Sequence, residues 1–264
     1  MRLDQLLHQQ GHYSSREKAR RAVMAGSVLV NDQKIDKPGT PVRDGAEIRI
    51  LDNKEPYVSR AGRKLAAALD HFQLDPREMR CLDVGASTGG FTDCLLQRGA
   101  TQIYALDVGY NQLVHQLRQD PRVVVMERVN ARHLSPDDLP NQAFDLVTFD
   151  VSFISLRLVV PPILPFVKAG GWVLPMIKPQ FEAGREQVGK GGIVRDPEVR
   201  RRVIEARIQD IKTMGLDLIE AVDSEVPGME GNREAFALFQ LTKPIEADSH
   251  TPQDVRKHPT ETAS

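Results

Sequence analysis

The sequence predicts an α/β protein in which a small α+β domain precedes a doubly wound, mostly parallel sheet. Three observations support this fold class. The chain has 264 residues, 41% of them hydrophobic, so it can bury a core in more than one domain. From residue 57 onward, strand patterns alternate with helical patterns, as in βαβ units. The polar stretch 51–56 (LDNKEP), which ends in proline, separates this region from a differently patterned N-terminal segment.

The first 50 residues have the pattern of a compact module built from short elements. The expected elements are a helix over 3–9, a helix that begins at Ser14 or Ser15 and ends at Gly26, and strands over 28–30 and 46–50. We therefore expect residues 1–50 to form a separate domain, with 51–56 as a linker.

Residues 57–244 are predicted to form the larger domain. An Ala-rich helix is expected over 59–72. The expected strands cover 81–84, 103–107, 123–126, 144–149, 172–177, 216–226 and 235–241. The last two strands have no helix between them, so an antiparallel edge is expected there. The polar residues 245–264 are expected to be a disordered tail.

A glycine-rich loop lies where an α/β sheet binds a nucleotide-like ligand. The segment 83–91 (DVGASTGGF) directly follows a predicted strand and opens a helix, and the next strand ends in Asp107. Glycines let the backbone approach a ligand, and a carboxylate at that position can accept hydrogen bonds from ribose hydroxyls. The pattern differs from the dinucleotide type and resembles the S-adenosylmethionine loop of methyltransferases. A tight structural turn is the alternative, because such turns also use glycine.

The bulk properties exclude several classes of protein. With 27% charged residues and a net charge of −1, the composition is that of an ordinary globular protein. Cys81 and Cys94 lack metal-binding spacing, so no metal site is expected. The N-terminus has no secretory pattern, and prolines and charges interrupt the most apolar region, 156–177. We therefore expect a cytoplasmic protein without a membrane span.

Positive charge gathers near the N-terminus. Residues 1–50 hold nine Lys or Arg against six Asp or Glu, and four of these bases lie within 16–21. At helical spacing Arg16 and Arg20 share one face, with Arg21 beside them, so they can contact phosphates along one side. A solvated charged helix is the alternative.

Five strings carry a family resemblance that covers nearly the whole chain. They are SRAGRKL around Lys64, LDVGASTGGFTD around Gly85, FDLVTFDVSFIS around Asp150, IKPQFE around Lys178 and GNREAF around Glu234. Residues 57–244 resemble the FtsJ-type ribose 2′-O-methyltransferases, and residues 1–50 resemble an S4 RNA-binding domain. Together they resemble the TlyA-type, or haemolysin A, family of rRNA cytidine 2′-O-methyltransferases. The resemblance implies a Rossmann-like class I methyltransferase sheet behind the S4 domain.

The resemblance implies a catalytic tetrad of Lys64, Asp150, Lys178 and Glu234, with S-adenosyl-L-methionine as the methyl donor. A ribose 2′-hydroxyl is a poor nucleophile at neutral pH, so a base must take its proton as the oxygen attacks in line. Lys178 is the candidate base or oxyanion stabiliser. Burial and the Lys64 cation would favour its neutral form, whereas the two carboxylates would favour its charged form. The carboxylates could instead orient the lysines and the ribose.

The resemblance also implies two sets of binding residues. The expected cofactor-binding residues are Asp83, Gly85, Ser87, Thr88, Gly89, Gly90, Phe91, Asp107, Val108, Asn130 and Asp150. The expected RNA-binding residues are Arg2, Ser15, Arg16, Lys18, Arg20, Arg21 and Asn31. The connector 57–60 either affects both kinds of binding or simply packs on the core, and the loop 182–194 either moves over the site or is a plain surface loop.

Two other functions stay open from the sequence. One is a non-catalytic RNA-binding ribosome-assembly factor, against which the complete tetrad and Asp107 count. The other is a membrane-active haemolysin, for which no membrane-inserting segment is evident. Within the family, a longer group modifies the RNA of both ribosomal subunits and a shorter group only the large one. Because the chain begins at MRLDQLL without extra basic residues, the expected partner is the 50S subunit and the expected substrate is a 23S rRNA cytidine.

Overall fold

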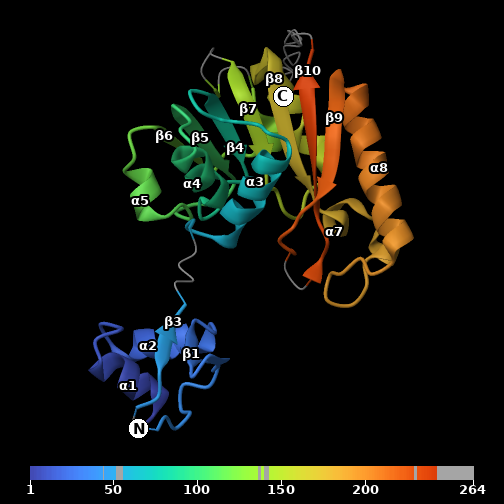
Figure 1. Cartoon of the computed structure of the whole chain (residues 1–264). Coiled ribbons are helices and arrows are strands. Elements are labelled where there is room, and N and C mark those ends of the chain that lie inside the picture. Colours follow the sequence, from blue (N-terminus) through green and yellow to red (C-terminus); the bar gives the residue numbers. More distant parts are fainter. Residues whose placement is uncertain (44, 52–55, 136–137, 140–142, 229–230, 243–264) are drawn as a thin grey trace, which may run out of the picture. The chain divides into compact units, whose positions relative to one another are not determined.

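The computed structural model describes all residues except 44, 52–55, 136–137, 140–142, 229–230 and 243–264. The chain divides into two compact units, Met1–Glu55 and Pro56–Ser264 (Figure 1). The expected linker over 51–56 falls mostly outside the described residues, and the expected disordered tail over 245–264 falls wholly outside them.

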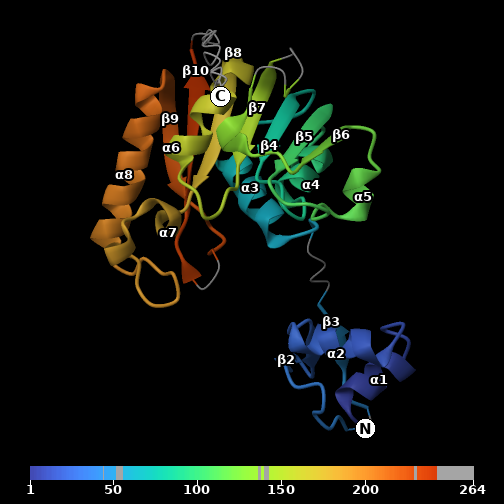
Figure 2. The same ribbon diagram turned by 180° about the vertical axis from the view of Figure 1, so that it is seen from behind.

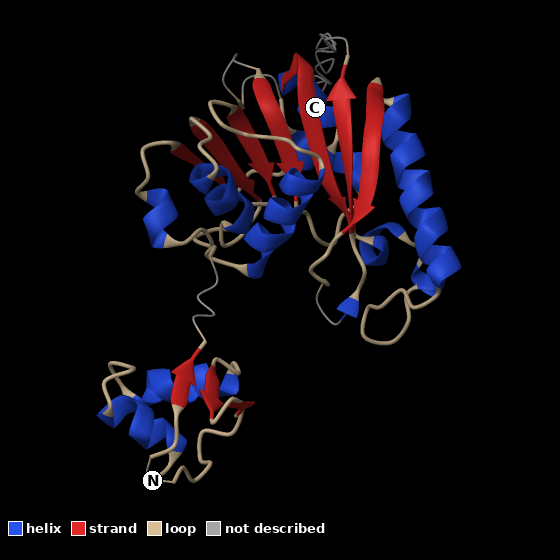
Figure 3. Ribbon diagram, viewed as in Figure 1, coloured by secondary structure: helices blue, strands red, loops and turns tan. Residues whose placement is uncertain are grey.

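The first unit packs two helices against a three-stranded antiparallel sheet (Figure 3). Its elements are α1 (Leu3–Gln9), α2 (Arg16–Met24), β1 (Val28–Val30), β2 (Gln33–Lys34) and β3 (Ile48–Ile50). The hydroxyl of Ser15 caps α2 by accepting a hydrogen bond from the backbone N–H of Lys18 at 3.2 Å. Leu3, Leu7 and Val23 are fully buried between the helices and the sheet. The two predicted helices are therefore confirmed, and the last strand begins two residues later than predicted.

The second unit is a doubly wound sheet of seven strands in the order β6-β5-β4-β7-β8-β10-β9. Its strands are β4 (Arg80–Val84), β5 (Gln102–Asp107), β6 (Val123–Glu127), β7 (Phe144–Phe149), β8 (Val167–Ile177), β9 (Leu216–Asp223) and β10 (Ala235–Leu241). Strands β4 to β8 pair in parallel, and β10 is antiparallel to both of its neighbours. The predicted α/β fold with an antiparallel strand pair at one end is confirmed.

Helices cover both faces of this sheet. They are α3 (Arg60–His71), α4 (Gly90–Gln97), α5 (His115–Arg118), α6 (Leu156–Val159), α7 (Pro179–Glu182) and α8 (Pro197–Thr213). Figure 1 looks onto the face that α3, α4 and α5 cover, and Figure 2 looks onto the other face, against which α6 and α8 pack. Because side chains alternate along a strand, neighbouring residues such as Cys81 and Leu82 belong to the two separate cores.

The direction of β10 brings its first residues to the same sheet edge as the carboxyl end of β8. Ala235, which opens β10, pairs with Ile177, which closes β8. The residue before β10 is Glu234 and the residue after β8 is Lys178, so the antiparallel pairing places these two side by side. This edge also holds the glycine loop after β4, and it is the edge at which α/β sheets bind ligands.

The structure of the described residues also bears on membrane insertion and on metal binding. None of their helices is both long and apolar enough to cross a membrane. In this part of the chain no group of three or more His, Cys, Asp or Glu side chains is placed to hold a metal ion. Cys81 and Cys94 are buried thiols in the core.

Asp83 lies inside the fold beneath the glycine loop. Its carboxylate has no exposure to solvent and accepts hydrogen bonds from the hydroxyl of Thr92 at 2.7 Å and of Thr148 at 3.3 Å. Burial raises the pKa of Asp83 to about 7, against the pull of these hydrogen bonds. Asp83 therefore connects β4, β7 and α4 beneath the glycine loop. Its ionisation near neutral pH places a charge in the core, which destabilises the folded state.

We predict that Asp83→Asn changes how stability depends on pH. In the wild type the folded pKa is raised above the unfolded one, so the free energy of unfolding falls as the pH rises from about 4 to about 7. The amide cannot ionise. The stability of the variant relative to the wild type should therefore grow by roughly 2–3 kcal/mol between pH 5 and pH 8, measured by urea unfolding. Parallel pH profiles for the two proteins would contradict the assignment.

Candidate active site

Two adjoining cavities open at the carboxyl edge of the large sheet. The first, here called the loop cavity, has a volume of about 470 Å³ and is lined by Val84, Gly85, Ser87, Leu106, Asp107, Val108, Gln112, Val129, Asn130, Ala131, Asp150, Val151, Ser152, Phe153, Ile154 and Val159. The second, the lysine cavity, has a volume of about 580 Å³ and is lined by Ser59, Arg60, Ala61, Lys64, Ser87, Asp150, Ser152, Phe153, Lys178, Gln180, Phe181, Gly191, Gly192, Asn232 and Glu234. Both volumes fall in the range of small-molecule sites.

The two cavities share part of their walls. Ser87, Asp150, Ser152 and Phe153 line both of them. A group bound in the loop cavity can therefore face a group bound in the lysine cavity across Asp150. Such an arrangement suits the transfer of a small group between two ligands.

Gly85 borders the loop cavity at a position that requires glycine. Its φ is +87°, and a Cβ built on it would lie 2.8 Å from the backbone oxygen of Asp150. Only glycine allows both this backbone conformation and this approach to the end of β7. The loop therefore stays close to Asp150, and the cavity is bounded by backbone on that side.

Gly89, Gly90 and Phe91 of the loop string allow close packing. A Cβ at Gly89 would meet Leu117 at 2.3 Å, and one at Gly90 would meet the hydroxyl oxygen of Ser59 at 2.2 Å. Phe91 is buried and packs against Phe236. Among the expected cofactor residues, only Gly85, Ser87, Asp107, Val108, Asn130 and Asp150 line the loop cavity. Thr88 borders a smaller neighbouring hollow, and Asp83 lies below the loop.

Asp107 sits on the wall of the loop cavity at the end of β5. One carboxylate oxygen accepts a hydrogen bond from the backbone N–H of Ser87 at 2.8 Å, and the other accepts one from that of Gly109 at 2.7 Å. A carboxylate oxygen can accept two hydrogen bonds, so each keeps acceptor capacity for a ligand. The fixed carboxylate suits a ligand that carries vicinal hydroxyls, as a ribose does.

Four ionisable side chains meet in the lysine cavity as two ion pairs. The ammonium of Lys64 lies 2.5 Å from a carboxylate oxygen of Glu234, and that of Lys178 lies 2.6 Å from one of Asp150. Lys64, Lys178 and Glu234 are only 6%, 8% and 3% exposed. The structure therefore brings together all four residues of the expected tetrad, from α3 and from the ends of three strands.

Burial and charge act in opposite directions on Asp150. Burial raises the pKa of its carboxyl, and the Lys178 and Lys64 cations limit that rise, while Glu234 adds to it. With all four groups ionised, two positive and two negative charges cancel. If one of the four groups gains or loses a proton, the site carries an unbalanced net charge. The protonation of these four groups therefore responds to a ligand that gives up or takes a proton.

Several residues at the site were missed by reasoning from sequence. The Lys178 ammonium donates a hydrogen bond to the hydroxyl of Ser152 at 3.0 Å, and the amide of Gln180 donates one to Glu234 at 3.3 Å. Phe153 is 91% exposed with a φ of +63°, and its ring lies 4.8 Å from that of Phe181. All four follow directly on the strand ends that carry Asp150 and Lys178, which is the signal that could have found them.

A buried ion pair between Glu182 and Arg207 stabilises the two segments that follow β7 and β8. Glu182, at the end of α7, accepts hydrogen bonds from the hydroxyl of Ser155 at 2.6 Å and the backbone N–H of Leu156 at 2.8 Å. Its carboxylate also lies 3.1 Å from the guanidinium of Arg207, which projects from α8 and is 7% exposed. The segment after β7 and the segment after β8 are therefore held to each other and to α8.

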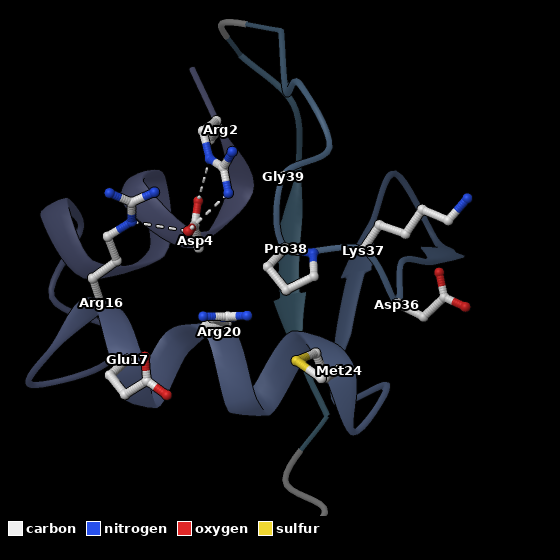
Figure 4. A pocket seen from close by; sticks show the side chains of 10 residues that line it. All are labelled: Arg2, Asp4, Arg16, Glu17, Arg20, Met24, Asp36, Lys37, Pro38 and Gly39. Carbon is white, nitrogen blue, oxygen red and sulfur yellow. Dashed lines mark hydrogen bonds and ion pairs between the residues drawn. The ribbon is translucent and has the colours of Figure 1, made fainter.

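The expected RNA-binding residues divide into three groups in the first unit. Arg2, Arg16 and Arg20 line a cavity of about 810 Å³ (Figure 4). Two others have structural hydrogen bonds: Ser15 caps α2, and the side-chain oxygen of Asn31, at a φ of +50°, accepts one from the backbone N–H of Glu47. Lys18 and Arg21 lie on α2 and do not line this cavity.

Comparisons with known proteins give the same division of the chain. Residues 57–241 match the FtsJ-like methyltransferase family, and residues 1–48 match the S4 domain. The 16S/23S rRNA (cytidine-2′-O)-methyltransferase TlyA of Mycobacterium tuberculosis is 42% identical, over 89% of this chain and 88% of the relative. The 23S rRNA (cytidine-2′-O)-methyltransferase TlyA of Campylobacter jejuni is 34% identical, over 80% of this chain and 81% of the relative.

A solved structure agrees with these relatives. A protein from Streptococcus thermophilus has a TM-score of 0.72 and 43% identity, and the match covers 94% of this chain and 91% of that one. The family match spans well over half of the chain, and the relatives align over most of their own length. The chain belongs to the FtsJ-like methyltransferase family and carries an S4 domain at its N-terminus.

Proposed function

We propose that this protein transfers a methyl group from S-adenosylmethionine to the ribose 2′-oxygen of a cytidine in ribosomal RNA. The single observation that carries the proposal is the pair of cavities that meet at Asp150. A methyl donor in one cavity and a ribose hydroxyl in the other would face each other beside two buried lysines. The names of the two TlyA relatives support this choice of reaction and substrate.

The loop cavity fits the methyl donor. Asp107 provides fixed acceptors for ribose hydroxyls, and Val108, Val129 and Val159 provide an apolar lining for a base. The exclusion of any side chain at Gly85 keeps the loop backbone close to the ligand. When bound, S-adenosylmethionine supplies a sulfonium methyl group that is already activated for attack.

Asp150 and Lys178 form a path for the proton that the ribose hydroxyl loses. Lys178 would give one of its protons to Asp150, whose carboxylate oxygen lies 2.6 Å away, and would take the hydroxyl proton in its place. The 2′-oxygen would then bond to the methyl carbon as the methyl–sulfur bond breaks and the donor leaves as a neutral thioether. The raised pKa of Asp150 makes its carboxylate a better proton acceptor than an exposed one. Of the two roles that the sequence left open for Lys178, we therefore propose proton transfer.

Lys64 and Glu234 act as the second pair. Glu234 holds Lys64 at 2.5 Å and receives the amide of Gln180 at 3.3 Å, so both charges are fixed on the wall of the lysine cavity. We assign Lys64 to stabilising negative charge on the attacking oxygen, since its ammonium lines the same cavity. Glu234 keeps that ammonium in place.

Asp107→Ala is expected to weaken the binding of S-adenosylmethionine by about 1–3 kcal/mol, because hydrogen bonds to a charged acceptor are lost. Asp217→Ala, an exposed carboxylate on β9, is the control and should bind as the wild type does. Isothermal calorimetry on the full chain measures both. Equal affinity of all three proteins would remove Asp107 from the cofactor site.

Lys178→Arg is expected to lower kcat for rRNA methylation by about 10²–10⁴-fold, because an arginine keeps the charge but does not release a proton. Lys168→Arg, at an exposed ion pair with Asp145, is the matched control. The rate of the wild type should fall on acidification at a pH above the ordinary range of a carboxyl group, as Asp150 becomes protonated. Turnover by Lys178→Arg near that of the wild type would rule out the proton path.

Within ribosomal RNA we propose a 23S rRNA cytidine as the substrate, since 23S is the RNA common to the names of both TlyA relatives. Incubation of isolated 50S and 30S subunits with labelled S-adenosylmethionine should label the 50S subunit efficiently and the 30S subunit little. Efficient labelling of the 30S subunit would extend the substrate range. Binding to subunits without labelling of either would instead favour a non-catalytic assembly factor.

A further inference from the structure

A buried carboxylate holds two arginines at the wall of the cavity in the first unit. Asp4, in the first turn of α1, is 2% exposed. Its oxygens accept hydrogen bonds from Nε of Arg2 at 3.1 Å and from Nε of Arg16 at 2.9 Å (Figure 4). Both arginine side chains remain about half exposed. Arg16 is thus anchored through Nε, and Arg2 through Nε and one terminal nitrogen at 3.4 Å, so the remaining guanidinium N–H groups stay available for a ligand.

Gly39 adds a second constraint on Arg2. A Cβ built on Gly39 would lie 3.3 Å from three atoms of the Arg2 guanidinium, which is tighter than ordinary packing. The guanidinium therefore lies flat against the loop backbone at this point. Arg2 is held on one side by Asp4 and packs on another against Gly39, where a Cβ would require a shift of a few tenths of an ångström.

Asp4 is ionised at neutral pH, as its contacts with two arginines require. Burial alone would raise the pKa of its carboxyl, but the hydrogen bonds from Arg2 and Arg16 outweigh burial and hold that pKa below the ordinary value. Asp4 is therefore an anion at neutral pH, paired with two cations, and the three groups together carry one positive charge.

We propose that Asp4 is a positioning residue for RNA binding: it holds Arg2 and Arg16 in the orientation in which their free N–H groups receive a phosphodiester of the RNA backbone. This inference rests on the proposed function, because it takes RNA as the ligand of the first unit. Guanidinium groups bind phosphate through paired N–H groups in a fixed plane, so their orientation matters as much as their charge. Arg20 lines the same cavity and adds a third cation.

The proposal predicts a change in RNA affinity opposite to the change that net charge alone predicts. Removing an anion from an RNA-binding surface strengthens binding if only net charge matters. If Asp4 positions the arginines, Asp4→Asn removes the charge and one of the two acceptor oxygens, and binding weakens because the arginines are held less firmly and must be ordered on association. We expect a loss of about tenfold in affinity, the equivalent of ordering one or two long side chains.

The test measures binding of the full-length protein to purified 23S rRNA at several salt concentrations. Glu17→Gln is the control, since Glu17 lines the same cavity and is exposed on α2, and it should bind no more weakly than the wild type. Asp4→Asn should raise KM for rRNA without changing kcat at saturating RNA. Thermal unfolding and affinity for S-adenosylmethionine check that the fold is kept.

Two further variants separate positioning from a merely structural role. Gly39→Ala pushes against the Arg2 guanidinium without touching Asp4 and should also weaken RNA binding severalfold. In a background with both Arg2→Lys and Arg16→Lys, Asp4→Asn should cause no further loss, since lysines lack the Nε edge that Asp4 holds. The inference is overturned if Asp4→Asn binds as tightly as the wild type or loses equally in that background. A wild type that does not bind rRNA would instead overturn the proposed function.

Discussion

The central constraint on this molecule is the enclosure of four charges in one cavity. Lys64, Glu234 and Lys178 are buried and the side chain of Asp150 is only 19% exposed, and an unpaired charge among them would cost several kcal/mol. Each must therefore reach an opposite partner with good geometry. That requirement explains why α3 and three different strand ends converge on one edge of the sheet, and why the segments that follow β7 and β8 are tied together through Glu182 and Arg207. The four side chains keep their relative positions because the surrounding segments leave them little conformational freedom.

The glycine loop shows how one short string serves several tasks. Gly85 keeps the loop against the end of β7, whereas Gly89 and Gly90 let α3 and α5 approach the start of α4. Asp83 lies beneath them and connects β4 to its neighbours through two threonines. A substitution in this string can thus disturb ligand binding, helix packing or the sheet, depending on which residue changes. The same applies in the first unit, where Ser15 and Asn31 support the backbone while Arg2 and Arg16 face the cavity.

The sequence predicted elements with a strong pattern and failed where the pattern is broken. The stretch 235–241 was predicted as a strand to the residue, because its side chains are almost continuously apolar. β8 begins five residues before the predicted start, since Lys168, Gly170 and Gly171 interrupt the apolar run and the pairing with β7 shifts register there. The tetrad was predicted through family strings, but the contacts of Ser152 and Gln180 were not. They depend on how segments distant in sequence meet, which no local pattern records.

The strand order has a consequence for how the enzyme is made. β10 is the last strand that the described residues form, yet it lies between β8 and β9, and it directly follows Glu234. During translation the sheet has a gap beside β8 until residues 235–241 leave the exit tunnel, and Lys64 lacks its partner until then. A nascent chain that stops short of β10 exposes an apolar strand edge and an incomplete site. Synthesis thus completes the lysine cavity in a single late step, so a translation product that stops before residue 234 lacks one of the two ion pairs of the site.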